Sequence, residues 1–447
     1  MKRKSSPLVI IGALSVLLLF SCTPPQPTKA WTKQMGSPAD DFAYAVALDE
    51  QGNAYIAGSS SGNFDGLRGA GYRDLILGKY DAGGRKLWST QMGTSSWEEA
   101  YSIAVGQKGD VYTVGYTYGG LDGNMNLGQY DFFLVKHDAG GNKLWSKQMG
   151  TEKNDYAYSV AVDKDGNAYV AGYTYGSFEG STNAGSADIF LIKYDTNGNM
   201  LWVRQMGTAS DDIAYGVAVD KDGNAYVAGY TGGGFDGNAH MGSWDIFLIK
   251  YDSNGTKLWS KQAGTPSWDE AWAVAVDKDG NAYVAGYTGG GLDGLKSSGA
   301  FDLFLIKYGS NGNKLWVKQT GTAENDYAHA VAVDANGNAY VSGYTEGGLG
   351  GVNRGDADPF VVSFSPKGRK LWTYQTGTSS GDYAFGVAVD SSMNVYAVGE
   401  TSGTIEENGS QGAYDLCLFK LNAPKEEGFF SRIKSFFKGL LKKIGIG

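Results

Sequence analysis

Histidine, cysteine and proline are scarce in this chain of 447 residues, which contains three His, two Cys and nine Pro. The few His and Cys residues lie far apart in the sequence and form no cluster with the ligand spacing of a zinc site. So little proline excludes a proline-rich disordered chain. The formal net charge of −9 also lacks the basic excess that is typical of nucleic-acid-binding proteins, and we therefore expect no nucleic-acid partner.

Glycine and aromatic residues are abundant instead. The chain has 68 Gly, and Phe, Trp and Tyr together make up 13% of it. The glycines do not follow the strict triplet period of collagen. Frequent Tyr, Thr and Val between the glycines indicate many short strands connected by turns, with enough apolar side chains to form a core.

The N-terminal segment has the pattern of a targeting signal. Positively charged residues 2–4 precede an apolar run at 8–20 that is too short to span a bilayer comfortably. The run ends in Leu-Phe-Ser-Cys at 19–22, which resembles a bacterial lipoprotein signal, although Phe20 departs from the motif. The resemblance implies a signal peptide at 1–21, a lipidated Cys22 that opens a tether at 22–29, and a location in the bacterial cell envelope. The alternative is an ordinary secretory signal with a chance cysteine.

The C-terminal segment, residues 423–447, is predicted to be a linker followed by a basic amphipathic helix. Between residues 429 and 444 apolar side chains recur at the spacing of one helical face, with five positive charges and no negative charge. Such a helix is typical of a membrane interface, and we therefore expect it to contact the membrane together with the Cys22 lipid. The alternative is a helix that packs on the protein's own domain.

A repeat dominates the chain between these ends. Seven tryptophans recur at a spacing of 57 residues five times and then 56, at Trp31, Trp88, Trp145, Trp202, Trp259, Trp316 and Trp372. In the third unit, four strands are expected at 157–162, 168–173, 189–194 and 200–205, with hairpin turns at 163–167 and 195–199. Seven such units predict an all-β fold, a seven-bladed β-propeller of four-stranded blades at 30–422. The small residues Ala157, Ser159 and Ala161 suit the crowded centre where the blades converge.

The repeat resembles a known family. Its core, Val-Asp-x-x-Gly-Asn-x-Tyr-Val-x-Gly, is similar to the bacterial β-propeller repeat called SBBP, and the resemblance extends from Trp31 to Asn422. The resemblance implies the propeller fold and assigns no single function.

The phase of the repeat predicts how the ring closes. The chain begins the repeat with a fourth-type strand at 30–34 and ends it after a third-type strand at 416–421, so the seventh unit lacks its own fourth strand. We therefore expect the N-terminal strand to complete the last blade and to cover its open edge.

Antiparallel alternation assigns the loops to two faces. We call the face with the tight hairpin turns the bottom, and the face with the long loops the top. Both chain ends leave from the bottom, so the top would point away from a membrane. A top-face acid opens the first strand of every unit: Asp41, Glu98, Asp155, Asp212, Asp269, Asp326 and Asp382. Because it recurs in every unit, we expect it to accept backbone N–H groups, with calcium binding as the alternative.

Residues that break the repeat are the candidates for function. Four tryptophans lie outside the register, Trp97, Trp244, Trp268 and Trp272, and we place all four on the top face or its rim. The last three are expected to cluster across one blade boundary, with His240 near Trp244. Such rings suit stacking on a sugar or holding a peptide, and the alternative is that each ring fills a gap between blades.

These observations predict an exported, lipid-anchored propeller that serves as a non-enzymatic scaffold. It would bind a protein, peptide or glycan at the top face, with no cofactor. The alternative is a lyase or hydrolase that uses top-face carboxylates near the central channel, and His329, at an inner-strand position where other units have Tyr or Trp, favours that alternative.

Overall fold

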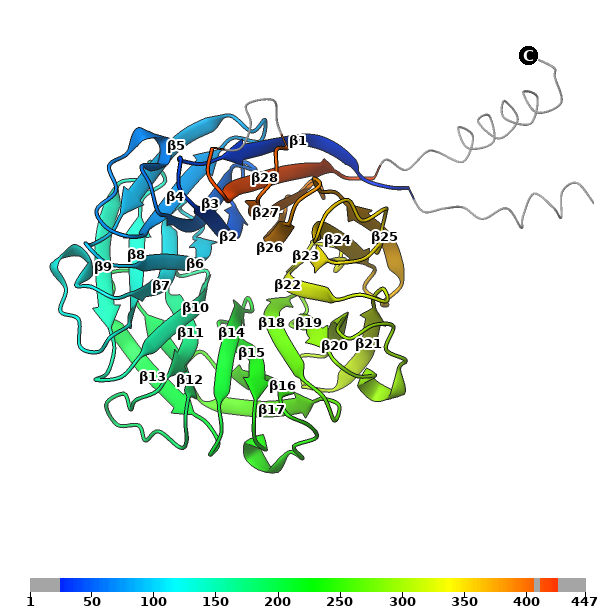
Figure 1. Ribbon diagram of the computed structural model, residues 1–447. Coiled ribbons are helices and arrows are strands. Elements are labelled where there is room, and N and C mark those ends of the chain that lie inside the picture. Colours follow the sequence, from blue (N-terminus) through cyan, green and yellow to red (C-terminus); the bar gives the residue numbers. More distant parts are fainter. Residues whose placement is uncertain (1–24, 406–410, 425–447) are drawn as a thin grey trace, which may run out of the picture. The chain divides into compact units, whose positions relative to one another are not determined.

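The computed structural model describes residues 25–405 and 411–424. Residues Thr28–Ala423 form one compact unit, and the other unit, Met1–Pro27 with Pro424–Gly447, lies almost entirely outside the described residues. The larger unit contains seven four-stranded antiparallel sheets arranged as blades around a central channel (Figure 1). The seven-bladed, four-stranded prediction is therefore confirmed. The expected Cys22 lipid site and C-terminal helix lie outside the described residues.

The first six blades run from the channel to the periphery in chain order, and in the seventh the N-terminal strand is the outermost. The innermost strands are β2 (Asp41–Leu48), β6 (Glu98–Val105), β10 (Asp155–Val162), β14 (Asp212–Val219), β18 (Asp269–Val276), β22 (Asp326–Val333) and β26 (Asp382–Val389). The second strands are β3 (Ala54–Ser60), β7 (Val111–Thr117), β11 (Ala168–Thr174), β15 (Ala225–Thr231), β19 (Ala282–Thr288), β23 (Ala339–Thr345) and β27 (Val395–Thr401).

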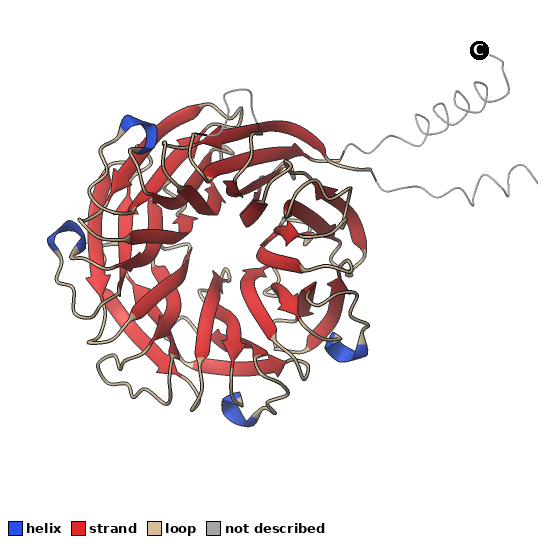
Figure 2. Ribbon diagram, viewed as in Figure 1, coloured by secondary structure: helices blue, strands red, loops and turns tan. Residues whose placement is uncertain are grey.

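The outer half of each blade follows the same order. The third strands are β4 (Asp74–Tyr80), β8 (Asp131–His137), β12 (Asp188–Tyr194), β16 (Asp245–Tyr251), β20 (Asp302–Tyr308), β24 (Asp358–Phe364) and β28 (Asp415–Asn422). The outermost strands are β5 (Lys86–Met92), β9 (Lys143–Met149), β13 (Met200–Met206), β17 (Lys257–Ala263), β21 (Lys314–Thr320), β25 (Lys370–Gln375) and β1 (Thr28–Met35). Short helical turns lie in four long loops: η1 (Phe64–Gly66), η2 (Leu121–Gly123), η3 (Phe235–Gly237) and η4 (Leu292–Gly294) (Figure 2).

The inner strand of the third unit begins two residues before its expected range of 157–162. It starts at Asp155, because that residue already pairs with Thr174 of β11. The hairpin turns have the predicted form. In the turn after β10 the N–H of Gly166 donates to the carbonyl of Asp163, and Gly166 adopts a φ of 85° that glycine tolerates without strain.

The hydrophobic cores lie between neighbouring blades. One core joins Tyr226 and Leu248 of the fourth blade to Val284 and Phe304 of the fifth. The repeat tryptophans reinforce these contacts. The indole N–H of Trp145 in the second blade, for example, donates to the carbonyl of Thr196 in the third blade. Each blade is therefore held by its neighbours, which makes closure of the ring decisive.

The N-terminal strand closes the ring as predicted. Strand β1 pairs antiparallel with β28, so the seventh sheet has the order β1-β28-β27-β26. Gln34 Nε2 donates to Asp415 Oδ2 at 2.7 Å and to the carbonyl of Gly403 at 2.9 Å. Trp31 Nε1 donates across the junction to the carbonyl of Ala82 in the first blade.

Among the described residues, no helix is long and apolar enough to cross a membrane.

Candidate functional site

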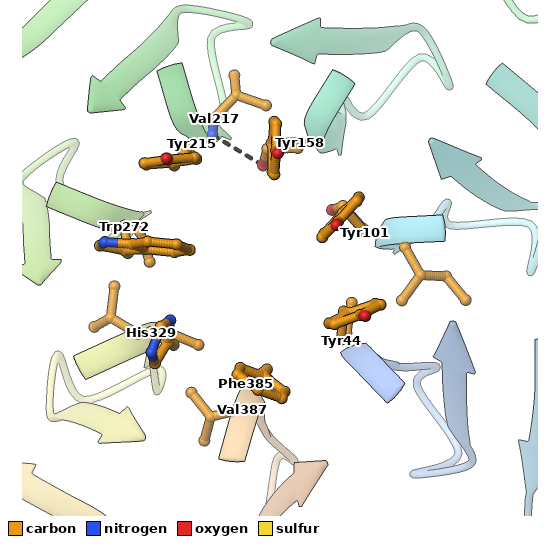
Figure 3. Close-up of a pocket in the computed structure, with 18 of the residues that line it drawn as sticks. Tyr44, Tyr101, Tyr158, Tyr215, Val217, Trp272, His329, Phe385 and Val387 are labelled. Atoms are coloured by element: carbon orange, nitrogen blue, oxygen red, sulfur yellow. Dashed lines mark hydrogen bonds between the residues drawn. The ribbon is translucent and has the colours of Figure 1, made fainter. Parts of the chain in front are cut away.

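Every inner strand contains a β-bulge at the same position. In β10 the register shifts between Ala157 and Ser159, so Tyr158 is the extra residue, and the shift recurs in the other six blades. A bulge redirects a side chain out of the regular alternation. The side chains at the bulges all line the central channel (Figure 3): Tyr44, Tyr101, Tyr158, Tyr215, Trp272, His329 and Phe385.

These seven side chains form a continuous ring, which we call the channel ring. The centroids of neighbouring rings lie between 4.2 Å, for Tyr215 and Trp272, and 5.6 Å, for Tyr44 and Phe385. Together with the two residues that follow each bulge, they line a cavity of about 420 Å³. Of the three small residues expected at the centre, Ser159 lines this cavity and Ala157 and Ala161 do not, and the bulge turns the large side chain of Tyr158 toward the axis as well.

Trp244 and Trp268 form an aromatic platform on the top face. Their ring centroids are 5.2 Å apart, and their backbones pair where the long loop of the fourth blade meets the start of the fifth. Trp268 is 47% exposed, and Trp244 also stacks on Tyr230 at 4.6 Å. The structure therefore brings together two of the three tryptophans that were expected to cluster at this boundary.

Trp272 and His329 are members of the channel ring. Trp272 was expected on the top face or its rim, and the structure places it at a bulge in the channel lining, 4.2 Å from Tyr215 and 4.6 Å from His329, measured between ring centroids. Burial lowers the pKa of His329 to about 4, so its imidazole is neutral near pH 7. Its Nε2 is buried with no hydrogen-bond partner among the described residues. His329 thus lacks the carboxylate partner that would orient a catalytic histidine.

The other two candidates lie elsewhere on the top face. Trp97 is 45% exposed at the boundary between the first and second blades, where the guanidinium of Arg73 lies 5.3 Å from the centroid of its ring. The Nδ1 atom of His240 lies 3.3 Å from the Oδ2 atom of Asp245.

Three carboxylates and one arginine beside the channel were not anticipated. Arg73 pairs with Glu99 at 2.5 Å, and the Tyr101 hydroxyl donates to the same carboxylate at 2.6 Å. Glu270 is buried and accepts the indole N–H of Trp272 at 3.2 Å. Burial raises the pKa of Glu400 to about 7, an effect that Arg73 opposes. A carboxyl group that titrates near pH 7 suits both ion pairing and proton transfer.

Their positions in the repeat carry a signal that could have revealed them. Glu400 occupies a second-strand position where five blades have tyrosine: Tyr116, Tyr173, Tyr230, Tyr287 and Tyr344. Glu99 and Glu270 each follow the first residue of an inner strand, a position that is aromatic or aliphatic in the other five blades. Charged residues at positions that are otherwise apolar break the repeat as clearly as the tryptophans do.

The repeated acids serve the fold. All seven are fully buried, and each accepts the backbone N–H of the residue four positions earlier, for example Asp155 from Thr151 at 2.6 Å. This is the role that their repetition predicts. Burial raises the pKa of Asp155 to about 6. Among the described residues, no group of three or more His, Cys, Asp or Glu side chains could hold a metal ion.

Comparison with known proteins places the repeat among propellers. The family described as SBBP, a β-propeller repeat, matches residues 30–65, 144–179, 201–236, 258–293, 315–350 and 371–405. The chain therefore carries SBBP repeats in six places. The six matches leave out residues 87–122, where the hairpin turn reads Gly-Gln-Lys-Gly-Asp at 106–110 instead of Asp-x-x-Gly-Asn.

Curated relatives are longer than this chain. A WD-repeat-containing protein of Acanthamoeba polyphaga mimivirus is 23% identical over 480 residues, which cover 84% of this chain and 34% of the relative. The regulatory protein FlaEY of Caulobacter vibrioides is 28% identical over 246 residues, covering 50% of this chain and 26% of the relative. This chain thus spans about a third or less of either relative's length.

A solved structure shares the architecture. The WD40 β-propeller domain of Doa1 superimposes with a TM-score of 0.50 and 11% identity, covering 90% of this chain and 98% of that domain. At this identity the likeness shows a WD40-like propeller fold.

Proposed function

We propose that this protein is an exported, lipid-anchored scaffold that binds a peptide segment of a partner protein at the top face. The observation that carries the proposal is the platform of Trp244 and Trp268, which stack on each other beside the channel and leave nearly half of Trp268 exposed. Large rigid aromatic rings supply binding energy at a small cost in conformational entropy, and they are enriched at the centres of protein interfaces.

The surroundings of the platform favour a peptide. The rings of Trp244, Tyr230 and Tyr215 contact one another in sequence and connect the platform to Trp272 of the channel ring. A segment of polypeptide could therefore lie across the platform and place one side chain at the mouth of the channel. Recognition by one deep side chain and a flat aromatic surface is a common way to hold a short segment.

Replacing both platform tryptophans tests this proposal. We expect the double variant Trp244→Ala/Trp268→Ala to lose binding by about tenfold or more on a peptide array, because truncated aromatic anchors typically carry most of an interface's energy. The matched control is Leu258→Ala, which removes an exposed apolar side chain of the outermost strand β17. Unchanged peptide binding by a folded double variant would contradict the proposal, as would binding confined to a parallel glycan array.

The lipid anchor is proposed from the sequence motif at residues 19–22. We expect labelled palmitate to be incorporated into the wild-type protein expressed in a bacterium, and the protein to sediment with membranes. The variant Cys22→Ser should incorporate no label and should appear in the soluble fraction. Equal labelling of the two proteins would contradict lipidation at Cys22. Substituting Cys417 instead provides the control, because that thiol is buried in the propeller.

A further inference from the structure

We propose that the mouth of the central channel binds an arginine side chain of the partner peptide, and that Glu400 is the carboxylate with which its guanidinium pairs. This inference rests on the proposed peptide-binding function and names the chemistry that its deepest subsite recognises. Four features carry it: the axial cavity, the way in which the protein holds its own Arg73, the lack of an ion pair at Glu400 among the described residues, and the negative charge around the channel mouth.

The cavity has the form that an arginine side chain requires. About 420 Å³ is enclosed on the axis by the channel ring and the aliphatic side chains near it, such as Val217 and Val387 (Figure 3). Apolar and aromatic walls suit the methylene stem, and a guanidinium is weakly hydrated enough to lie against aromatic rings. The imidazole of His329 also lines this cavity.

The protein already holds one guanidinium at the top face. The guanidinium carbon of Arg73 lies 4.6 Å from the ring centroid of Phe42 and 5.3 Å from that of Trp97, and its nitrogen pairs with Glu99. Both aromatic contacts are within the range of a cation–π interaction. The same combination of aromatic rings and a carboxylate therefore stabilises an arginine at the boundary between the first and second blades.

Glu400 lacks such a cation. Within the part of the chain that the structure describes, Glu400 forms no ion pair, and Arg73 is engaged by Glu99 instead. Glu400 is half-buried in β27, where its strand partner is Tyr383 of the inner strand. In the five blades that have tyrosine at this position, its ring contacts the channel-ring residue of the same blade, as Tyr173 contacts Tyr158 at 5.8 Å between ring centroids. The repeat therefore places Glu400 beside Phe385 of its own blade. The charge of Glu400 also raises the pKa of Tyr44. A half-buried carboxylate without a cation gains most from a ligand that supplies one.

The field around the channel mouth favours a positive ligand. Glu99 raises the pKa of Tyr101, Glu270 raises that of Tyr215, and Glu400 raises that of Tyr344. Arg73 is the cation that opposes them at Tyr44. Such a ring of carboxylates attracts basic partners and disfavours acidic ones.

A pair of blocked pentapeptides tests the inference with the full chain by titration calorimetry. The first has the sequence Gly-Gly-Arg-Gly-Gly, and in the second citrulline replaces arginine, which keeps the shape and removes the charge. We expect the arginine peptide to bind about tenfold or more tightly at pH 7.5. In Glu400→Gln this preference should vanish. The control Glu324→Gln, which removes the same charge from an exposed top-face loop, should keep it.

The pH dependence provides a second readout. Because the pKa of Glu400 is about 7, its carboxyl group is largely protonated at pH 6 and ionised at pH 8. Arginine-peptide affinity should therefore rise across this range in the wild type and stay flat in Glu400→Gln. The charged groups that act on Glu400 are Arg73, which lowers its pKa, and Asp40 and Glu99, which raise it. The other titratable groups near it are the hydroxyls of Tyr44, Tyr344 and Tyr383 and the thiol of Cys417, whose own pKa values stay above the range tested.

Each outcome decides one of the two proposals. Equal binding of the arginine and citrulline peptides would overturn the arginine subsite while leaving the platform intact. Loss of arginine preference in Glu324→Gln as well as in Glu400→Gln would overturn the assignment to Glu400 and indicate a diffuse field. Failure of the wild type to bind either peptide would overturn the subsite, and the Trp244→Ala/Trp268→Ala array experiment would then decide the proposed function separately.

Discussion

Replacing Gln34 with proline is expected to destabilise the whole propeller, because the ring closes through a single strand. Gln34 pairs with Cys417 in the β1–β28 ladder, and its side chain joins Asp415, Gly403 and Ile405. A proline removes the backbone N–H and the amide together. We expect a loss of about 3 kcal/mol or more in the free energy of unfolding, seen as a melting temperature lower by about 4 °C or more.

A control substitution, Ala30→Pro, separates the effect of opening the ring from the general effect of introducing a proline into β1. Ala30 lies at the bulge between Lys29 and Trp31, where the register of β1 shifts, and it is exposed. Proline is tolerated at such positions, so Ala30→Pro should melt within about 2 °C of the wild type. The open edge of β28 should also make Gln34→Pro prone to aggregate. If the two variants melt at the same temperature, β1 does not hold the ring closed.

Replacing Gly172 with alanine is the second substitution with a large expected effect. A methyl group added at Gly172 would lie 1.9 Å from the carbonyl oxygen of Tyr156 and 2.9 Å from Phe190 Cζ. This close approach occurs because the bulge in β10 pushes the inner strand against β11. Alanine would therefore disturb the bulge that directs Tyr158 into the channel, at a cost of about 3 kcal/mol or more.

Urea unfolding measures this cost, with Gly351→Ala as the control. The nearest atom to an added methyl group at Gly351 is 3.9 Å away, at Gln375 Cβ, so this variant should differ from the wild type by less than about 0.5 kcal/mol. A Gly172→Ala variant as stable as Gly351→Ala would mean that the bulge yields readily and does not fix the channel ring.

The fold was predictable because its signals are local and repeated. Hairpin turns such as the one at Asp163 and the recurrent tryptophans fixed the strand order and the number of blades. The phase of the repeat predicted the pairing of β1 with β28. Strand starts were less accurate, because Asp155 belongs to a strand by its pairing although its residue type is typical of a loop.

The channel ring was harder to foresee. A strand with two-residue alternation does not reveal a bulge, and the bulge decides that Tyr158 faces the axis. For the same reason Trp272 was assigned to the top face or its rim, although its unit aligns it with Tyr158. Glu400 was missed because its pKa is raised by burial, which depends on the packing of the blades, and because Arg73, which opposes this shift, lies far away in the sequence. A comparison of residue types at each repeat position would have identified Glu400 as an exception. The residues that surround it, such as Arg73, can be recognised only once the blades are closed into a ring.

The central claim is that binding is carried by the residues that break the repeat. Fluorine NMR of protein labelled with 5-fluorotryptophan tests it directly, with the arginine pentapeptide as titrant and each resonance assigned by a Trp→Phe substitution. The account predicts that the resonances of Trp244, Trp268 and Trp272 move on binding, while those of repeat tryptophans such as Trp145 and Trp202 stay in place. The central claim would be contradicted if the resonances of the repeat tryptophans shifted while those of Trp244, Trp268 and Trp272 did not.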